Sequence, residues 1–243
     1  MMRVNDRGIN HILFDLDETL YPKEMGLMAV VGQRMNDYMR LRLGIPASQV
    51  PELRKRYVRR YGTTGRGLYL HHHLDIDDYL VYVHDLPVEE YLSPDPLLDE
   101  MLGSIEAEKE VFTNSPREYV QRVLRALGVE RHFDRIFDIY FLEQISKPDR
   151  RAYLKVIEAL ETDGQDCLIV DDLARNLKPG KDLGMVTVLV GDDPILKDPL
   201  GKGFLSRRSQ RDPVGDPEGW EKGEGVDFVI SKVTELERIM KRA

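Results

Sequence analysis

The stretch HILFDLDETLYP at residues 11–22 constrains the fold of this chain more than any other. An apolar run ends abruptly in Asp15, Asp17 and Thr19, which is typical of a buried strand with acids at its C-terminal end. In an open α/β sheet, ligands bind in the crevice beyond the carboxyl ends of the strands, so charge placed there favours chemistry over packing. Taken alone, the same pattern also fits a strand followed by an ordinary acidic turn.

A second strand-like run ends in Thr113 and Asn114. We expect Ser115 to cap the helix that follows, with Pro116 as the first helical residue and Glu118 completing a capping box. A strand that runs directly into a helix presents free backbone N–H groups, and with the Thr113 hydroxyl these predict a phosphate site. A well-capped turn without a ligand is the alternative.

Residues 136–141 predict another strand, and Lys147 stands just before the next helix. A cation is disfavoured there unless it has an anionic partner such as phosphate, although a solvated loop lysine also explains it. The strand at 167–170 ends in Asp171 and Asp172. Four carboxylates at two strand ends repel one another, and Lys147 offsets only one charge. Mg²⁺ is the simplest further compensation, because it prefers carboxylate, water and phosphate oxygens.

Residues 21–97 have the pattern of a small all-helical insert. We expect helices over residues 24–43, from Pro51 onward, and over 68–73, 75–84 and 96–105. The second of these helices carries a group of cations that we interpret as a solvated face, with steering of an anionic substrate as the alternative: Arg54, Lys55, Arg56, Arg59 and Arg60.

Residues 185–190 and 227–230 predict two further strands, and strands that alternate with helices favour a doubly wound parallel sheet. Pro179 and Gly180 predict that the helix after the second acidic pair is broken or begins late. The intervening residues 191–226 are rich in glycine, proline and charge, and we expect them to form a mobile or peripheral segment.

Composition excludes several classes of protein. With 42% hydrophobic residues, 32% charged residues and a net charge of -8, the chain is globular and lacks the basic character of a nucleic-acid-binding protein. No apolar run reaches the roughly 18 residues of a membrane span, and the N-terminus lacks an apolar signal core. We therefore expect a cytoplasmic protein without membrane or nucleic-acid partners. Cys167 lies in an apolar run and is interpreted as a buried hydrophobe.

Four segments in this order resemble the four motifs of the haloacid dehalogenase superfamily of phosphohydrolases: Asp15-x-Asp17-x-Thr19, Thr113-Asn114, Lys147-Pro148 and Asp171-Asp172. The resemblance extends from about residue 9 to residue 190. It implies a Rossmann-like core at residues 1–20 and 98–243, with a helical cap at 21–97 inserted after the first strand. The segments LYPK and YGTTGRGL, which begin at residues 20 and 61, are similar to the pyrimidine 5′-nucleotidase branch.

The resemblance implies a Mg²⁺-dependent phosphomonoester hydrolase with an aspartyl-phosphate intermediate. Asp15 would be the nucleophile, and Asp17 the general acid for the leaving group and then the base for water. The phosphate-binding residues would be Thr113, Asn114 and Lys147. The metal ligands would be Asp15, the backbone carbonyl of Asp17, Asp171 and Asp172. The candidates for contact with the leaving group are Tyr61 and Arg66 in the cap.

The expected partner is a small phosphorylated metabolite, first of all a pyrimidine nucleoside 5′-monophosphate, bound by a monomer or homodimer. A phosphatase of a small sugar or organic-acid phosphate is the main alternative. The dehalogenases of the superfamily do not keep the second aspartate, so Asp17 argues against their chemistry. A non-catalytic binding module on the same fold would usually have lost a motif residue, and here all are present.

Overall fold

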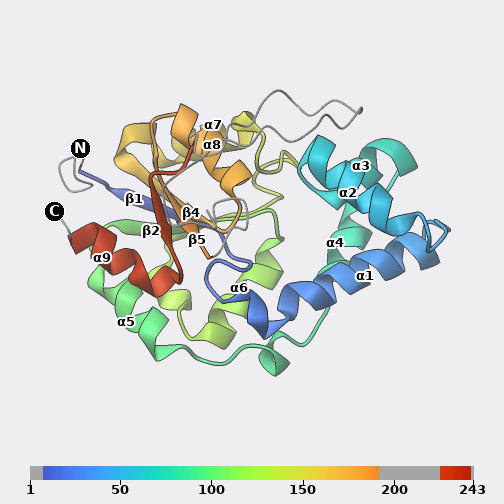
Figure 1. Cartoon of the computed structure of the whole chain (residues 1–243), viewed down its shortest axis with the longest axis horizontal. Helices are drawn as coiled ribbons and strands as arrows, with labels where there is room; N and C mark the ends of the chain where they lie inside the picture. Colours follow the sequence, from blue (N-terminus) through green and yellow to red (C-terminus); the bar gives the residue numbers. More distant parts are fainter. Residues whose placement is uncertain (1–7, 192–224, 242–243) are drawn as a thin grey trace, which may run out of the picture.

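The computed structural model describes residues 8–191 and 225–241, and a six-stranded sheet forms the centre of this part (Figure 1). All neighbouring strands are parallel, in the order β3-β2-β1-β4-β5-β6. The strands are β1 His11–Phe14, β2 Glu108–Phe112, β3 Arg135–Phe137, β4 Cys167–Asp171, β5 Val186–Val190 and β6 Phe228–Ile230. The predicted doubly wound α/β fold is confirmed.

β1 lies at the switch point of the sheet, because β2 and β4 pair with it on opposite sides. The chain builds β2 and β3 on one side of β1 and then crosses over to build β4, β5 and β6 on the other. Ligand crevices in such sheets form at this point, beyond the carboxyl ends of the strands. The acids that follow β1 and those at the end of β4 therefore share one crevice.

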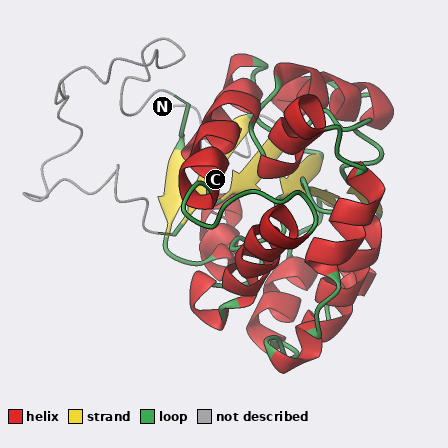
Figure 2. Ribbon diagram, turned by 90° about the vertical axis from the view of Figure 1, so that its right-hand side faces the viewer, coloured by secondary structure: helices red, strands yellow, loops and turns green. Residues whose placement is uncertain are grey.

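Helices cover both faces of the sheet (Figure 2). One face packs against α5 Pro96–Ser104, α6 Arg117–Leu127 and α9 Leu236–Lys241, and the other against α7 Arg150–Leu160 and α8 Ala174–Asp182. Side chains along β4 alternate between the faces: Leu168 and Val170 join the first cluster, whereas Cys167 and Ile169 join the second. Cys167 is therefore a buried free thiol, as the sequence predicts.

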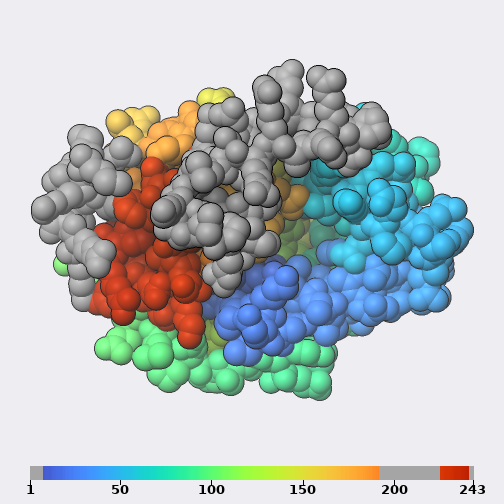
Figure 3. Space-filling model, viewed as in Figure 1, coloured from blue at the N-terminus to red at the C-terminus, as the bar shows by residue number. Residues whose placement is uncertain are grey.

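The insert between β1 and β2 is helical, as predicted. Its helices are α1 Leu27–Leu41, α2 Val50–Tyr61, α3 Thr64–His72 and α4 Ile76–His84. They enclose a hydrophobic cluster of their own, which Ile139 from the core also joins. The residues of α1 and α2, coloured blue to cyan, form a continuous lobe beside the core (Figure 3). The domain boundaries at residues 20 and 97 stay predictions. Leu27 and Val88 lie within the predicted insert, yet their side chains pack into the hydrophobic cluster of the core.

Two helices of the insert begin elsewhere than expected. α1 begins at Leu27 rather than at residue 24, because Gly26 adopts a φ of 77° and separates it from a short 3-10 helix, Lys23–Met25. α3 begins at Thr64 rather than at residue 68, because the Thr63 hydroxyl caps it. Further 3-10 helices are Val88–Glu90, Glu130–His132, Gly164–Asp166 and Val233–Glu235.

Two predictions about the core are wrong. β3 ends at Phe137 rather than at residue 141, because the Asp138 carboxylate accepts the Phe141 N–H and starts a turn. α8 is not broken at Pro179 and begins early, at Ala174. A Cβ at Gly180 would approach the Met185 sulfur to 3.0 Å, so the glycine lets α8 pack closely on the sheet. This burial offsets the hydrogen bond that the proline cannot donate.

The segment 191–226, for which we predict mobility, lies outside the described residues except at its two ends. Among the residues that are described, no helix combines the length and the apolar character needed to cross a membrane.

Candidate active site

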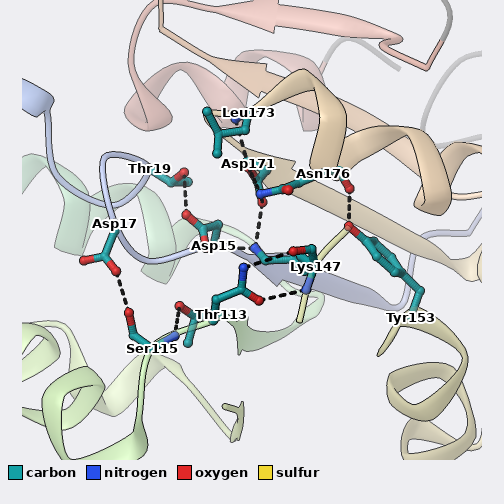
Figure 4. A network of polar contacts seen from close by, with 11 residues as sticks. Asp15, Asp17, Thr19, Thr113, Ser115, Lys147, Tyr153, Asp171, Leu173 and Asn176 are labelled. Carbon is teal, nitrogen blue, oxygen red and sulfur yellow. Dashed lines mark hydrogen bonds and ion pairs between the residues drawn. The ribbon is translucent and has the colours of Figure 1, made fainter. Parts of the chain in front are cut away.

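Polar side chains from three neighbouring strands meet at the carboxyl edge of the sheet (Figure 4). Asp15 follows β1, Thr113 follows β2, and Asp171 is the last residue of β4. Lys147 reaches the same place from the loop before α7. All four are at most 7% exposed. The fold thus brings together four of the residues that the sequence singles out.

Lys147 bridges two carboxylates. Its Nζ donates to Asp15 Oδ1 at 2.8 Å and to Asp171 Oδ2 at 2.7 Å, and it lies 5.0 Å from the centre of the Phe112 ring. Burial opposes the charge of the lysine, but the two carboxylates outweigh it and raise the pKa of Lys147 above its ordinary value. Lys147 is therefore a fixed cation at neutral pH.

The site holds more acid than this one lysine offsets. Burial, together with the charges of Asp171 and Asp17, raises the pKa of Asp15 to about 7 against the opposing effect of Lys147. Burial and the charges of Asp171 and Asp15 raise the pKa of Asp172 to about 9. One oxygen from each of Asp15, Asp171 and Asp172 lies within 4.8 Å of the others. An excess of buried negative charge on an all-oxygen cluster fits a hard divalent cation.

Asn176, which the sequence analysis missed, orients Asp171. Its Nδ2 donates to the two carboxylate oxygens at 2.9 and 3.1 Å, and the Leu173 N–H donates to Oδ1 at 2.9 Å. The available signal was an asparagine placed where the next helix begins, five residues after the acid. With Lys147 on Oδ2, these donors fix the plane of the Asp171 carboxylate.

The Asp17 carboxylate points toward a group of hydroxyls rather than toward Lys147 (Figure 4). Tyr21 and Tyr119 donate to Oδ1 at 2.6 and 2.9 Å, and Ser115 donates to Oδ2 at 2.7 Å. Burial and the charge of Asp17 raise the pKa of both phenols well above the ordinary tyrosine value, so they stay donors. The sequence analysis missed both tyrosines, although Tyr21 follows Asp17 by one helical turn.

The capping box predicted at Ser115 is wrong. α6 begins at Arg117, and its N-cap residue, Pro116, provides no side-chain hydrogen bond to the helix. The Ser115 hydroxyl is bonded to Asp17 instead, and the Asp138 carboxylate accepts the Arg117 N–H at 3.0 Å. The terminus of α6 therefore offers fewer free N–H groups to a phosphate than the sequence suggests.

Asn114 holds the loop that carries Lys147. Its Oδ1 accepts the Lys147 N–H at 2.8 Å, and its Nδ2 donates to the Lys147 carbonyl at 3.2 Å. The phosphate contact predicted for Asn114 uses its backbone N–H, which donates to no residue that the structure describes. Thr113 and Asn114 both line the cavity beside Asp15.

A cavity of about 410 Å³ lies between the sheet edge and the insert. Asp15, Asp17 and Asp172 line it on the core side. The wall formed by the insert includes Met28, Val31, Met35, Arg54, Val58, Arg66, Tyr79 and Leu80. Its volume falls within the roughly 300–1,000 Å³ typical of small-molecule sites.

The two cap residues with predicted leaving-group contacts differ in position. Arg66 lines the cavity and donates to the backbone carbonyl of Gln144 in the core. Tyr61 is not among the lining residues, and its hydroxyl is bonded to His71 Nε2 at 2.6 Å. The geometry therefore favours Arg66 over Tyr61 as a residue that faces a substrate.

Comparison with known proteins places the chain in a family. The family model of haloacid dehalogenase-like hydrolases matches residues 9–184. Phosphate metabolism protein 8 of Saccharomyces cerevisiae is 27% identical over 192 residues, which cover 72% of this chain and 60% of that protein. The chain thus spans about three fifths of that relative. Bifunctional epoxide hydrolase 2 of Rattus norvegicus is 36% identical over 64 residues, 26% of this chain and 11% of that protein.

Solved structures share the fold at low identity. A phosphatase of this superfamily from Thermococcus onnurineus is 21% identical, with a TM-score of 0.55 over 96% of this chain and 98% of that chain. An L-2-haloacid dehalogenase from Xanthobacter autotrophicus is 18% identical, with a TM-score of 0.56 over 96% and 99%. At such identity the likeness shows the fold alone. Because the family model matches well over half of its residues, the chain belongs to the haloacid dehalogenase-like hydrolases.

Proposed function

We propose that this chain is a Mg²⁺-dependent phosphomonoester hydrolase that works through an aspartyl phosphate on Asp15. The observation that carries the proposal is the bridge from Lys147 to Asp15 and Asp171, next to a cavity that Asp15 and Asp17 line. A fixed cation next to the nucleophile stabilises charge on the phosphoryl oxygens in the transition state. The name of the yeast relative, phosphate metabolism protein 8, supports chemistry on a phosphate compound.

The chemistry needs two displacements at phosphorus. In the first, an Asp15 oxygen bonds to phosphorus, the bond to the leaving oxygen breaks, and Asp17 donates a proton to that oxygen. In the second, Asp17 takes a proton from water as the water oxygen attacks phosphorus, which releases inorganic phosphate and restores the Asp15 carboxylate. Thr113, the Asn114 N–H and Lys147 hold the phosphoryl oxygens throughout.

Asp15, Asp171, Asp172 and the backbone carbonyl of Asp17 would hold the Mg²⁺. When bound, the ion supplies positive charge that offsets the carboxylates and the phosphoryl oxygens. Burial and the neighbouring carboxylates raise the pKa values of Asp15 and Asp172, and a bound cation would stabilise the charged form of both.

Within this class, we propose a pyrimidine nucleoside 5′-monophosphate as substrate. The cavity has room for a nucleoside, and Met28, Val31 and Leu80 offer apolar surface to a base. A small sugar or organic-acid phosphate is the second candidate, favoured by arginines that also line the cavity, Arg54 and Arg66.

Two other classes fit the site less well. A dehalogenase has no use for an acid that protonates a leaving alkoxide, which is the role proposed for Asp17. Three hydroxyls fix the position of that carboxylate. A binding module would not need a carboxylate nucleophile next to a buried lysine, which is costly to maintain without chemistry.

The test is Mg²⁺-dependent phosphate release from UMP, CMP, dTMP, AMP, GMP, phosphoglycolate and several sugar phosphates. We expect release by the wild type and a loss of at least about a thousandfold in Asp15→Asn, because the nucleophile is gone. Asp182→Asn, the same change on an exposed carboxylate outside the cavity, is the matched control. Full Mg²⁺-dependent activity of Asp15→Asn would refute the mechanism.

A further inference from the structure

Arg54, an arginine of the cavity wall, has only neutral hydrogen-bond partners among the described residues. It belongs to α2, and its Nη1 donates to two neutral acceptors on α1, the Gly32 carbonyl at 2.9 Å and Asn36 Oδ1 at 2.7 Å. Among residues 8–191 and 225–241, no carboxylate lies within 4.0 Å of its guanidinium nitrogens. Burial lowers the pKa of Arg54, and no carboxylate opposes this effect.

Carboxylates influence the other two arginines of the cavity, although none forms an ion pair within 4.0 Å with them in the described part of the chain. Arg175 lies under the influence of Asp171 and Asp172, whose charges oppose the fall in its pKa. Arg66 lies close enough to Asp149 to lower the pKa of that carboxyl. A half-buried guanidinium without a counter-charge is unfavourable, so an acceptor on a ligand would stabilise Arg54. Arg175 Nε is also buried without a partner among the described residues and belongs to the same cavity lining.

Tyr79 supplies an independent observation at the same place. Its side chain is 2% exposed, and its hydroxyl has no hydrogen-bond partner among the described residues. The ring is fixed by an edge contact with Tyr38 at 5.2 Å and by Gly65, where a Cβ would come within 2.9 Å of it.

Both residues line the cavity that contains Asp15 and Asp17. At about 410 Å³, that cavity is far larger than a phosphoryl group requires. A water molecule takes up only about 30 Å³ of liquid, so most of the space is available to a leaving group. The buried, unpartnered phenol and the uncompensated guanidinium belong to this remaining space.

We propose that Arg54 and Tyr79 form a subsite for acceptor oxygens on the leaving group of the substrate. The inference rests on the proposed function, which places the phosphoryl group at Asp15. Both residues can donate hydrogen bonds, so the subsite favours a group that presents acceptor oxygens. The carbonyls of a pyrimidine, a carboxylate and a second phosphoryl group share this chemistry.

The experiment compares kcat/KM for four probes: UMP, phosphoglycolate, fructose 1,6-bisphosphate and phenyl phosphate. Phenyl phosphate is the reference, because its leaving group carries no acceptor beyond the scissile oxygen. The variants are Arg54→Met and Tyr79→Phe, with Arg59→Met as the matched control. Arg59 lies on the same helix, is exposed and is not part of the cavity.

We expect Arg54→Met to lower kcat/KM for at least one acceptor-bearing probe by about tenfold to a hundredfold, as for hydrogen bonds lost from a charged donor. Tyr79→Phe should lower it by about threefold to tenfold. Phenyl phosphate should change by less than about threefold with every variant, within the range of side effects of a remote substitution. A loss confined to UMP identifies the pyrimidine carbonyls, and a loss confined to the other two identifies an anionic group.

Equal losses on all four probes would overturn the subsite, since they would indicate a general structural effect. If the wild type releases phosphate from no probe, the proposed function fails, and binding of the same probes by calorimetry then decides the subsite. The subsite is overturned if the probes bind Arg54→Met as tightly as the wild type. It is also overturned if the probes bind neither protein.

Discussion

The two walls of the cavity differ in how fully their polar groups are paired. At the sheet edge, the catalytic candidates Asp15, Asp17 and Asp171 accept hydrogen bonds from side chains fixed by several elements, although Arg175 Nε and Asn176 Oδ1 nearby on α8 have no partner among the described residues. On the wall formed by the insert, Arg54 meets only neutral acceptors and the Tyr79 hydroxyl meets none among the described residues. A satisfied network fixes one geometry, whereas unpaired donors favour a ligand. We infer that the core performs the chemistry and the insert chooses the substrate.

The largest effect that sharpens this comparison comes from Asp17. Asp17→Asn should lower kcat/KM for UMP by about 10²- to 10⁴-fold, because the leaving alkoxide loses its proton donor. p-Nitrophenyl phosphate should lose much less, since its phenolate leaves without a proton. Steady-state kinetics on both substrates checks this, and equal losses would contradict the role of Asp17 as general acid.

Lys147→Met tests the pairing on the core side. The variant leaves Asp15 and Asp171 buried without their shared cation, so it should lower the free energy of unfolding by about 3–5 kcal/mol. Urea unfolding measures this loss. Lys155→Met is the control, because the one carboxylate that pairs with Lys155 among the described residues is the exposed Glu143. Losses of similar size in the two variants would show that the buried ion pairs of Lys147 do not stabilise the fold.

The buried carboxylates on the core side outnumber the cations that offset them, and this predicts how the free energy of unfolding depends on pH. Unfolded aspartates titrate near pH 4, whereas the folded pKa values of Asp15 and Asp172 are about 7 and about 9. Between these limits the folded chain binds more protons, so without metal its free energy of unfolding should fall as pH rises from about 4 to about 9.

Mg²⁺ should reverse this loss, because it binds the deprotonated carboxylates. At a hundredfold excess over its Kd it adds roughly 2.7 kcal/mol. Urea unfolding at several pH values, with Mg²⁺ or with a chelator, measures both effects. Asp172→Asn should flatten the metal-free profile, and metal-free stability that rises steadily over this range would contradict the acid excess.

The smallest effect concerns the insert. The Asp75 carboxylate caps α4 by accepting the N–H groups of Asp77 and Asp78 at 3.0 and 3.1 Å. Asp75→Ala should cost about 1 kcal/mol of stability. Turnover of phenyl phosphate should stay unchanged, since the core performs the chemistry. A fall in the kcat for phenyl phosphate, at a temperature where the variant is folded, would contradict the inference that the core alone performs the chemistry.

The core side of the site could be predicted from sequence because its signals are local. An apolar run that ends in Asp15 or Asp171 marks a strand end, and a parallel sheet brings such ends to one edge by topology. The position of Lys147 in the site could not be predicted from its local sequence, since a loop lysine has many possible environments. Its role became predictable only from the order of the motifs along the chain.

The insert side could not be predicted, because there tertiary contacts decide among equivalent residues. Arg54 is one of five cations on α2, and only its fit against Gly32 and Asn36 on α1 turns it toward the cavity. The capping box predicted at Ser115 was wrong for a related reason. The Ser115 hydroxyl can cap a helix or donate to Asp17, and the position of Asp17 in the folded chain decides between the two.

The central claim is that Asp15 carries the phosphoryl group, and rapid acid quench during turnover tests it most directly. Mass spectrometry of the digested enzyme should find a phosphoryl group on the peptide that contains Asp15. The group should be absent from Asp15→Asn and from wild-type enzyme quenched without substrate. A phosphoryl group on a different residue, or phosphate release by Asp15→Asn at the wild-type rate, would contradict the account.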